Sequence, residues 1–269
     1  MSKKIKLVLS GSGCLYPVHV GAVLRLAEAG YEIVEVCGTS GGAIVASAIA
    51  SGYPLNQELV RLIKATLPGK NGLIDTSIWS LFKDWGLVKG SKLEELFEKK
   101  FIKKFSEAKI PLHVVTTNVD SGKISIFSSS KTPLMSVSRA VRASLSVPIV
   151  FTPVRIDDEL HVDGGIMANF FLDIFGKGDD VIGLKFKAVA DQKGNKNKVK
   201  GFIDFLLRIV DSLIQGSTNE HIEDAIFART ILLESKHSGT NYKMTESDVD
   251  DMIKEGYMAV DHWLAVGHT

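Results

Sequence analysis

Cysteine and net charge are scarce in this sequence. The 269 residues include only two cysteines, Cys14 and Cys37. Two cysteines cannot build a disulfide framework or a four-ligand zinc site, and they fit a reducing compartment best. The 32 basic residues nearly balance the 31 acidic ones, which leaves a net charge of +1. No overall electric field therefore attracts the chain to nucleic acid or to an anionic membrane.

Long apolar segments are also missing. The longest apolar run, Gly41–Ala50, falls well short of the ~20 residues that a transmembrane helix needs. The basic N-terminal stretch has an apolar part broken by Lys6, which is shorter than the roughly 7–15 residues of a signal-peptide core. These absences predict a cytoplasmic protein, in contact with a membrane only at its surface if at all.

The composition, with 45% hydrophobic and 23% charged residues, is that of a globular protein and excludes disorder, collagen-like repeats and coiled coil. No internal repeat, low-complexity tract or convincing linker divides the chain, so we expect one domain over residues 1–269. Its length suffices for one sizeable core.

Strand-like and helix-like segments alternate over the first fifty residues. Apolar β-type runs at 5–10 and 32–37 each lead through a Gly/Ser loop into a helical pattern, at 18–29 and 43–50. This order is typical of a parallel sheet covered by helices, and it predicts an α/β fold.

The remaining segments are assigned by the same periodicities. Helices are expected at 55–67, 77–85, 91–105 and 134–144, with Ser91 and Glu94 as a capping box. Strands are expected at 112–117, 123–127, 154–156, 160–162 and 181–186. The part from 200 to 266 is expected to be helical, with helices at 201–215, 219–230 and 245–265.

The segment Gly38-Thr-Ser40-Gly-Gly42 matches Gly-x-Ser-x-Gly, the nucleophile elbow. Small residues on both sides of the serine let a strand turn sharply into a helix, which projects the hydroxyl out of the sheet. The alternative is a tight turn in which Ser40 only caps the following helix. The elbow by itself leaves both roles open.

A second glycine-containing loop, Gly11-Ser12-Gly13-Cys14, also joins a strand to a helix. It is neither a Walker loop, since no Gly-Lys-Ser/Thr follows, nor a dinucleotide fingerprint, since Tyr16 occupies the third glycine position. What remains is a run of unhindered N–H groups that can bind an anion, such as the oxyanion of an ester under attack. The alternative is a tight connection that needs positive φ.

A nucleophilic serine needs a base. Among the histidines late in the chain, His221, His237, His262 and His268, none stands out as a triad partner. Asp163 is a better candidate, because it ends an apolar strand and precedes Gly164-Gly165. A carboxylate there can accept the proton of Ser40 if the two lie within hydrogen-bond reach. Its alternative role is an Asx turn.

Four blocks together resemble the patatin-like phospholipases. They are Leu9-Ser-Gly-Ser-Gly-Cys14 with His19-Val-Gly21, Gly38-Thr-Ser-Gly-Gly42, Arg139-Ala-Val-Arg-Ala-Ser144 with Pro148-Ile-Val-Phe151 and Pro153, and Val162-Asp-Gly-Gly165 with Asn169. They span residues 5 to 170 in the family's order, and the motif-bearing core is taken as 5–175. The last hundred residues carry no such signature.

The resemblance implies a three-layer α/β/α fold with a mainly parallel central sheet, and a Ser–Asp dyad with Ser40 as nucleophile and Asp163 as base. It also implies an oxyanion hole made by the loop Gly11, Ser12, Gly13, Cys14, with elbow and turn support from Gly38, Gly42, Gly164 and Gly165. A lipid or other acyl-ester substrate follows, with no metal, no organic cofactor and no nucleic acid.

The chain departs from the family's glycine loop, which usually reads Gly-Gly-Gly-x-Arg/Lys-Gly. Ser12 replaces the middle glycine, Leu15 the basic residue and Tyr16 the last glycine. Ser12 keeps an N–H and offers a hydroxyl as a further donor. Losing the basic residue removes a partner for a phosphate headgroup, so the sequence favours acyl-ester hydrolysis over a phospholipid preference.

Two apolar clusters bear on the substrate side. One lies in the helical insert (Ile78, Trp79, Leu81, Phe82, Trp85), and the other recurs at helical spacing in 201–215 (Phe202, Phe205, Leu206, Ile209, Leu213). Such stripes usually face a core, so we favour core packing over an acyl-chain or membrane-facing surface. Two functional alternatives stay open: a Ser–His–Asp esterase, and a lipid-binding module without catalytic activity.

Overall fold

The computed structural model describes residues 2–67, 73, 78–176, 178–187, 199–218 and 229–267, without the side chains of Ile78, Trp79, Phe82, Ile203 and Thr218. The strands are β1 (Lys3–Leu9), β2 (Tyr31–Thr39), β3 (Gly86–Val88), β4 (Leu112–Asn118), β5 (Lys123–Ser128), β6 (Ile149–Phe151), β7 (Val154–Ile156), β8 (Glu159–Asp163), β9 (Val181–Phe186) and β10 (Thr230–Leu233). The α-helices are α1 (Tyr16–Glu28), α2 (Gly41–Ala50), α3 (Gln57–Ala65), α4 (Ile78–Lys83), α5 (Ser91–Lys100), α6 (Val137–Ser144), α7 (Gly165–Ala168), α8 (Phe202–Thr218) and α10 (Glu246–Ala265).

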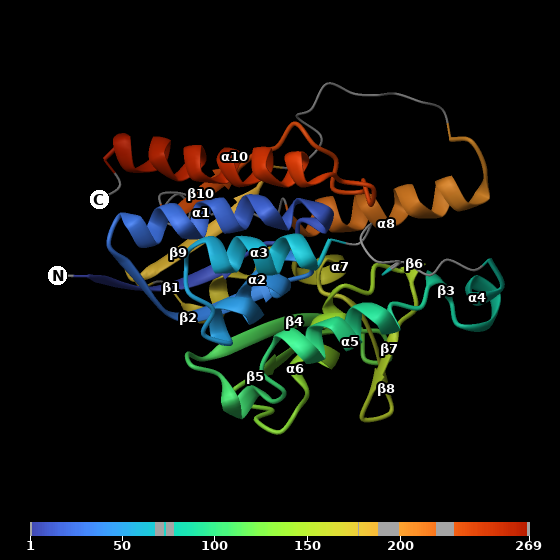
Figure 1. Cartoon of the computed structure of the whole chain (residues 1–269). Helices are drawn as coiled ribbons and strands as arrows, with labels where there is room; N and C mark the ends of the chain where they lie inside the picture. The colour runs from blue at the N-terminus through green and yellow to red at the C-terminus, as the bar shows by residue number, and fades with distance from the viewer. Residues whose placement is uncertain are drawn as a thin grey trace.

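One large sheet organises the chain, with strand order β10-β9-β1-β2-β4-β8-β7 and with β5 also paired to β4 (Figure 1). The pairs from β10 to β4 are parallel, whereas β5 and β8 run antiparallel to β4. The carboxyl ends of the parallel strands therefore share one edge, where loops between strands and helices collect functional groups.

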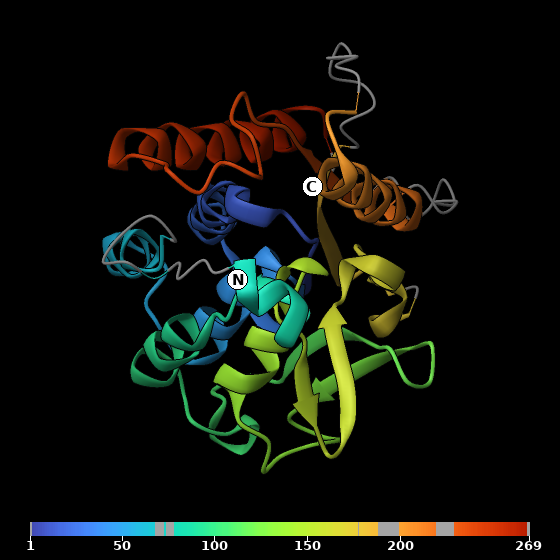
Figure 2. The ribbon, with the colours of Figure 1, turned by 90° about the vertical axis from the view of Figure 1, so that its right-hand side faces the viewer.

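Two hydrophobic clusters cover the two faces of this sheet. Alternate residues of β1 divide between them: Leu7 and Leu9 join the larger cluster with α1 and α2, while Val8 joins the smaller one with α7. This alternation follows from the two-residue period of a strand. Figure 2 shows the larger helical group on one side of the sheet and α7 with α8 on the other. The predicted three-layer α/β/α architecture with a mainly parallel sheet is confirmed.

Helices α1 and α10 pack closely because each carries a glycine at the crossing. A Cβ added to Gly21 would lie 1.8 Å from the carbonyl oxygen of Ile253, and one added to Gly256 would lie 1.8 Å from that of Val18. The C-terminal helix is thereby joined to the first helix of the motif-bearing part.

Several expected elements need correction. The strand β10 covers Thr230–Leu233, whereas the sequence placed Thr230 at the end of a helix; its residues pair with β9 instead. The short strands β3 and β6 were not expected, because they form a separate pair whose signal is only three residues each. The rest of the helix expected at 219–230, up to residue 228, lies outside the described residues.

The capping box expected at Ser91 and Glu94 is also wrong. Gly90, in a left-handed conformation with φ 69°, is the N-cap of α5, so Ser91 already lies inside the helix. The Glu94 carboxylate instead accepts a hydrogen bond from Arg139 at 3.2 Å.

Four of the five apolar residues expected to face the core from α8 face solvent instead. Phe202, Phe205, Ile209 and Leu213 are 72%, 48%, 43% and 51% exposed, whereas Leu206 is half-buried. The half-buried Leu206 and the buried Val210 lie next to them around the helix. The apolar side of α8 is therefore wider than the part that packs, and periodicity alone could not tell which part is exposed. In the helical insert, Trp85 is exposed, and the side chains of Ile78, Trp79 and Phe82 lie outside the description.

Candidate active site

Ser40 occupies a sharp turn between β2 and α2. Its backbone has φ 50° and ψ −124°, a conformation that residues other than glycine rarely adopt. The Ser40 N–H donates to Ser144 Oγ at 2.8 Å, and Ser144 Oγ donates to the Val115 carbonyl at 2.7 Å. This chain of hydrogen bonds ties the strained turn to α6 and β4.

The glycines that flank Ser40 leave room for this turn. A Cβ on Gly38 would lie 2.6 Å from the carbonyl oxygen of Gly42, and a Cβ on Gly42 would lie 2.5 Å from that of Leu9. Because the obstacles are backbone atoms, a larger residue at either position requires the strand or the helix to shift.

Sheet register brings Asp163 to Ser40. Thr39 at the end of β2 pairs with Val115 of β4, and Asp163 at the end of β8 pairs with the next residue, Thr116. Strands β2 and β8 thus arrive at neighbouring positions of β4 from opposite directions. The Ser40 hydroxyl donates to Asp163 Oδ2 at 2.6 Å, and it makes no helix-capping hydrogen bond.

The Asp163 carboxylate combines both roles that the sequence suggested. Its Oδ1 accepts the N–H of Gly165 at 2.7 Å, as in an Asx turn, while Oδ2 accepts the Ser40 hydroxyl. The residue is 1% exposed. Burial raises the pKa of the Asp163 carboxyl from 3.8 to about 6, although both hydrogen bonds act in the opposite direction. The group is thus ionised at neutral pH but a stronger base than an ordinary aspartate.

The loop Gly11–Cys14 lies beside the elbow, and its four residues differ in what they can donate. The N–H of Gly11 donates to the Asn169 carbonyl at 2.9 Å, and that of Cys14 donates to the Gly239 carbonyl at 2.8 Å. These bonds hold the two ends of the loop and occupy two of the four backbone donors predicted for the oxyanion hole. Ser12 and Gly13 remain as the candidate donors.

The Ser12 hydroxyl is placed against the residue after Ser40. A Cβ on Gly41 would lie 2.4 Å from Ser12 Oγ. That oxygen is buried and has no hydrogen-bond partner among the described residues. A buried hydroxyl without a partner costs free energy, which a ligand oxygen accepting its hydrogen would recover.

His19 supports the strand end that leads into this loop. Its Nε2 donates to the Ser10 carbonyl at 2.9 Å. Full burial lowers the pKa of His19 to about 4, so the ring is neutral at physiological pH. It therefore positions backbone and adds no charge to the site.

Several supporting residues were not assigned a role from the sequence. Ser144 holds the Ser40 N–H, the Ser146 carbonyl accepts the N–H of Asp163 at 2.9 Å, and Gly239 accepts that of Cys14. Ser144 lies in one of the blocks that resemble the family, and this resemblance is the sequence feature that could have indicated a role for it. Gly239 belongs to the last hundred residues, where the sequence offered none.

The described histidines contact groups other than Ser40. The contacts are His19 with Ser10, His113 with Glu35, His161 with Thr116, and His237 with Asp248 at 3.8 Å. His262 lies on α10 and lines a cavity whose described lining does not include Ser40. His221 and His268 lie outside the described residues. The partner that the structure gives the Ser40 hydroxyl is Asp163.

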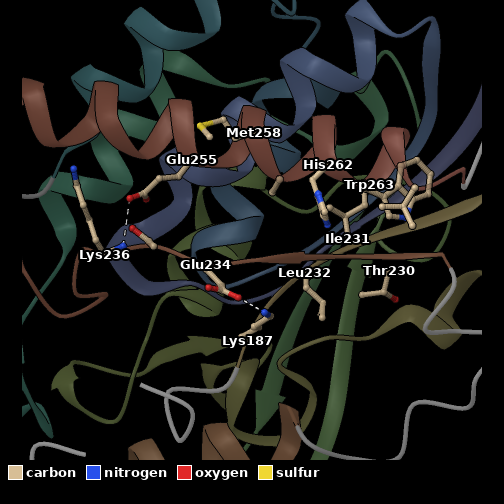
Figure 3. Close-up of a pocket in the computed structure, with 13 residues that line it drawn as sticks. Lys187, Thr230, Ile231, Leu232, Glu234, Lys236, Glu255, Met258, His262 and Trp263 are labelled. Atoms are coloured by element: carbon tan, nitrogen blue, oxygen red, sulfur yellow. Dashed lines mark hydrogen bonds and ion pairs between the residues drawn. The ribbon is translucent and has the colours of Figure 1, made fainter. Parts of the chain in front are cut away.

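A cavity of about 1000 Å³ lies between β10 and α10, away from the dyad (Figure 3). His262 and Trp263 of α10 line it opposite Ile231 and Leu232 of β10, and Lys187 pairs with Glu234 at its floor. The described residues around it include neither Ser40 nor the glycine loop.

Within the described ranges, no three His, Cys, Asp or Glu side chains gather in a way that could hold a metal ion. The helices of the same ranges are too short or too polar to cross a bilayer.

Comparison with known families identifies the group to which these elements belong. The family model described as patatin-like phospholipase matches residues 7–175, which contain Ser40, Asp163 and the glycine loop. The chain belongs to this family. The match ends before β9, so the C-terminal third of this patatin-like chain lies beyond it.

The chain is also similar to individual proteins. An uncharacterised mimivirus protein, R571 from Acanthamoeba polyphaga mimivirus, is 28% identical over 85% of this chain and 82% of its own length. The uncharacterised YqhO of Bacillus subtilis (strain 168) is 29% identical over 83% of this chain and 82% of its own. The crystal structure of VipD from Legionella pneumophila covers 98% of this chain and 67% of its own, with TM-score 0.64 at 18% identity, and thus shares the fold.

Proposed function

We propose that this protein is a serine acyl hydrolase that cleaves fatty-acyl esters of lipids with a Ser40–Asp163 dyad. The observation that carries the proposal is the 2.6 Å hydrogen bond from the Ser40 hydroxyl to Asp163 Oδ2. It joins a strained elbow serine to a buried carboxylate of raised pKa, which is the arrangement of an activated nucleophile. Membership of the patatin-like phospholipase family supports a lipid substrate.

In the first half-reaction, Ser40 Oγ attacks the acyl carbonyl while Asp163 takes its proton. The negative charge that develops on the carbonyl oxygen is stabilised by donors of Ser12 and Gly13 and by the N-terminal end of α2, which begins at Gly41. The tetrahedral intermediate collapses, the ester C–O bond breaks, and Asp163 returns the proton to the leaving alcohol.

In the second half-reaction, water attacks the acyl-Ser40 ester and transfers a proton to Asp163. Collapse of the second intermediate releases the fatty acid, and the proton returns to Ser40 Oγ. This sequence needs no histidine, because one carboxylate serves as base and then as acid.

A fluorophosphonate probe tests the dyad directly. We expect the probe to label the wild-type chain, and labelling to be lost in Ser40→Ala and strongly reduced in Asp163→Asn. Ser47→Ala is the matched control, since Ser47 lies in α2, the helix that follows Ser40, and its hydroxyl is also buried without a partner among the described residues. Absence of labelling in wild-type protein, under conditions that label a known serine hydrolase, would contradict the proposal.

The same probe separates the two alternatives. A Ser–His–Asp esterase requires one of His221, His237, His262 or His268, so replacing that histidine would abolish labelling while Asp163→Asn would preserve it. A lipid-binding module would bind lipid with neither labelling nor hydrolysis of p-nitrophenyl esters.

A further inference from the structure

Helix α8 presents an apolar stripe to solvent. Phe202, Phe205, Ile209 and Leu213 follow each other at steps of three and four residues, which places them along one side of a helix. Their exposed fractions lie between 43% and 72%. A helix in a water-soluble protein normally turns a polar side outward, so a stripe of this length on the outer side indicates a binding surface.

Exposed apolar side chains of the molecule gather at this helix. Eleven large apolar residues are exposed in the described part of the chain, and six of them lie on α8 or beside it. Besides the four of the stripe, they are Val199, which precedes α8, and Met167 of α7, the helix against which α8 packs. The remaining five are distributed over other parts of the described chain.

Helix α8, which carries the stripe, contacts the turn that follows Asp163. Ser217 Oγ, in the last turn of α8, donates to the Gly165 carbonyl at 2.6 Å. The Ile214 side chain lies 3.5 Å from the position of a Cβ on Gly165. Gly165 in turn donates its N–H to Asp163. Figure 2, which looks onto the edge where the parallel strands end, shows α8 at that edge next to α7.

Charge on α8 does not favour an anionic partner. Its described charged side chains are Asp204, Arg208 and Asp211; Arg208 pairs with Asp204 at 3.2 Å, and Asp211 accepts a hydrogen bond from Gln215 at 2.8 Å. With two acids and one base, the helix has no excess positive charge for acidic headgroups. Its attraction to a surface must therefore come from apolar burial.

We propose that the α8 stripe, defined as Phe202, Phe205, Ile209 and Leu213, adsorbs to the surface of a zwitterionic lipid layer and holds the Asp163–Gly165 turn against it. This inference rests on the proposed function, since an ester-cleaving dyad next to the stripe is the reason for choosing lipid over a protein partner. An amphipathic helix that lies in an interface buries its apolar side among headgroups and acyl chains, which brings lipid esters to the dyad.

Binding is tested with Ser40→Ala protein and phosphatidylcholine vesicles, so that no substrate is consumed. We expect Ser40→Ala to sediment with the vesicles, and Phe205→Ser with Ile209→Ser on the same background to weaken binding by at least about tenfold, because two large apolar groups no longer leave water. The matched control is Val119→Ser with Met258→Ser on the same background. These residues have similar exposure, 49% and 58%, and lie in the turn after β4 and on α10; the control should bind as Ser40→Ala does.

Several results would overturn the inference. They are equal binding by the stripe variant and its Ser40→Ala parent, no binding by either, or binding that requires anionic lipid and disappears at high salt. A chain that is dimeric in sedimentation, and that the stripe substitutions convert to a monomer, would show that a second copy covers the stripe. Thermal melting checks that each variant is folded.

Hydrolysis assays separate this inference from the proposed function. With Ser40 restored, the stripe variant should hydrolyse a monomeric p-nitrophenyl ester at the wild-type rate and vesicle lipid at least about tenfold more slowly. Vesicle binding without any hydrolysis by the wild-type chain would refute the proposed function and leave the docking surface standing. Hydrolysis of both substrates without binding, at equal rates in the stripe variant, would refute the docking surface alone.

Discussion

The ionisation of Asp163 sets the expected pH dependence of the reaction. Burial raises the pKa of this carboxyl to about 6, so below that pH it is mostly protonated and cannot accept the proton of Ser40. We expect kcat/KM for a soluble ester to rise with pH through about 6 and to level off above it.

The Asp163→Asn variant is the control for this profile. It preserves an oxygen for the Gly165 N–H but removes the base, so the activity should fall by orders of magnitude at every pH. Substantial residual activity with the same pH profile would assign the profile to another group.

Ser12 replaces the middle glycine of the family's loop, and its hydroxyl gives a testable difference from the other members. If its buried hydroxyl donates to the oxyanion, Ser12→Ala lowers kcat by about ten- to hundredfold, with a small effect on KM, because the donor acts mainly in the transition state. Steady-state kinetics on a p-nitrophenyl ester measures both constants. Ser47→Ala removes another buried hydroxyl without a described partner and should change neither constant; an equal loss in both variants would indicate a packing effect.

The candidate dyad could be proposed from the sequence because each of its residues has a local signature, although the pairing of the two residues came from the resemblance of four ordered blocks to a family. Ser40 has glycines on both sides that a tight turn requires, and Asp163 ends an apolar strand before two glycines. The residues that hold them have no such signature. Gly239 accepts the N–H of Cys14 across more than two hundred residues, and only the folded chain reveals that contact.

At the scale of elements, periodicity located most of the sheet and most of the helices. It failed where tertiary pairing decides the structure, as in β10, whose four residues become a strand by pairing with β9. On α8 it found the apolar residues but predicted the wrong environment for four of five, because periodicity does not show how much of a wide apolar side is packed.

The crossing of α1 and α10 predicts opposite effects for two glycine-to-alanine substitutions. At Gly256 the new methyl group would meet the Val18 carbonyl, so we expect a loss of ~1–3 kcal/mol or more in the free energy of unfolding. At Gly216 of α8 nothing lies within 4 Å of the added atom, and the better helix propensity of alanine should contribute about 0.5–1 kcal/mol. Urea unfolding measures both; similar values for the two would contradict the close crossing.

At the scale of the whole molecule, the part beyond the family match completes the fold. Strand β9 pairs with β1, α10 packs on α1, and the Gly239 carbonyl holds the glycine loop. Residues 1–176 alone should therefore fail to form a cooperative native state, because β1 becomes an edge strand and the buried side of α1 meets water. Limited proteolysis and a thermal melt, with the full chain as reference, test this; a cooperative melt of the shorter chain would contradict it.

The meeting of β2 and β8 on neighbouring residues of β4 has a consequence for how this protein can diversify. The backbone hydrogen bonds of β4 with β2 and β8 fix the distance between the nucleophile and its base. The Asp157–Asp158 turn, which joins β7 to β8, lies at the opposite end of β8 from Asp163. Insertions at that turn lengthen the hairpin away from the chemistry and leave the pairing of Asp163 with Thr116 intact. A peptide or a further module inserted at this turn should therefore leave the positions of Ser40 and Asp163 unchanged.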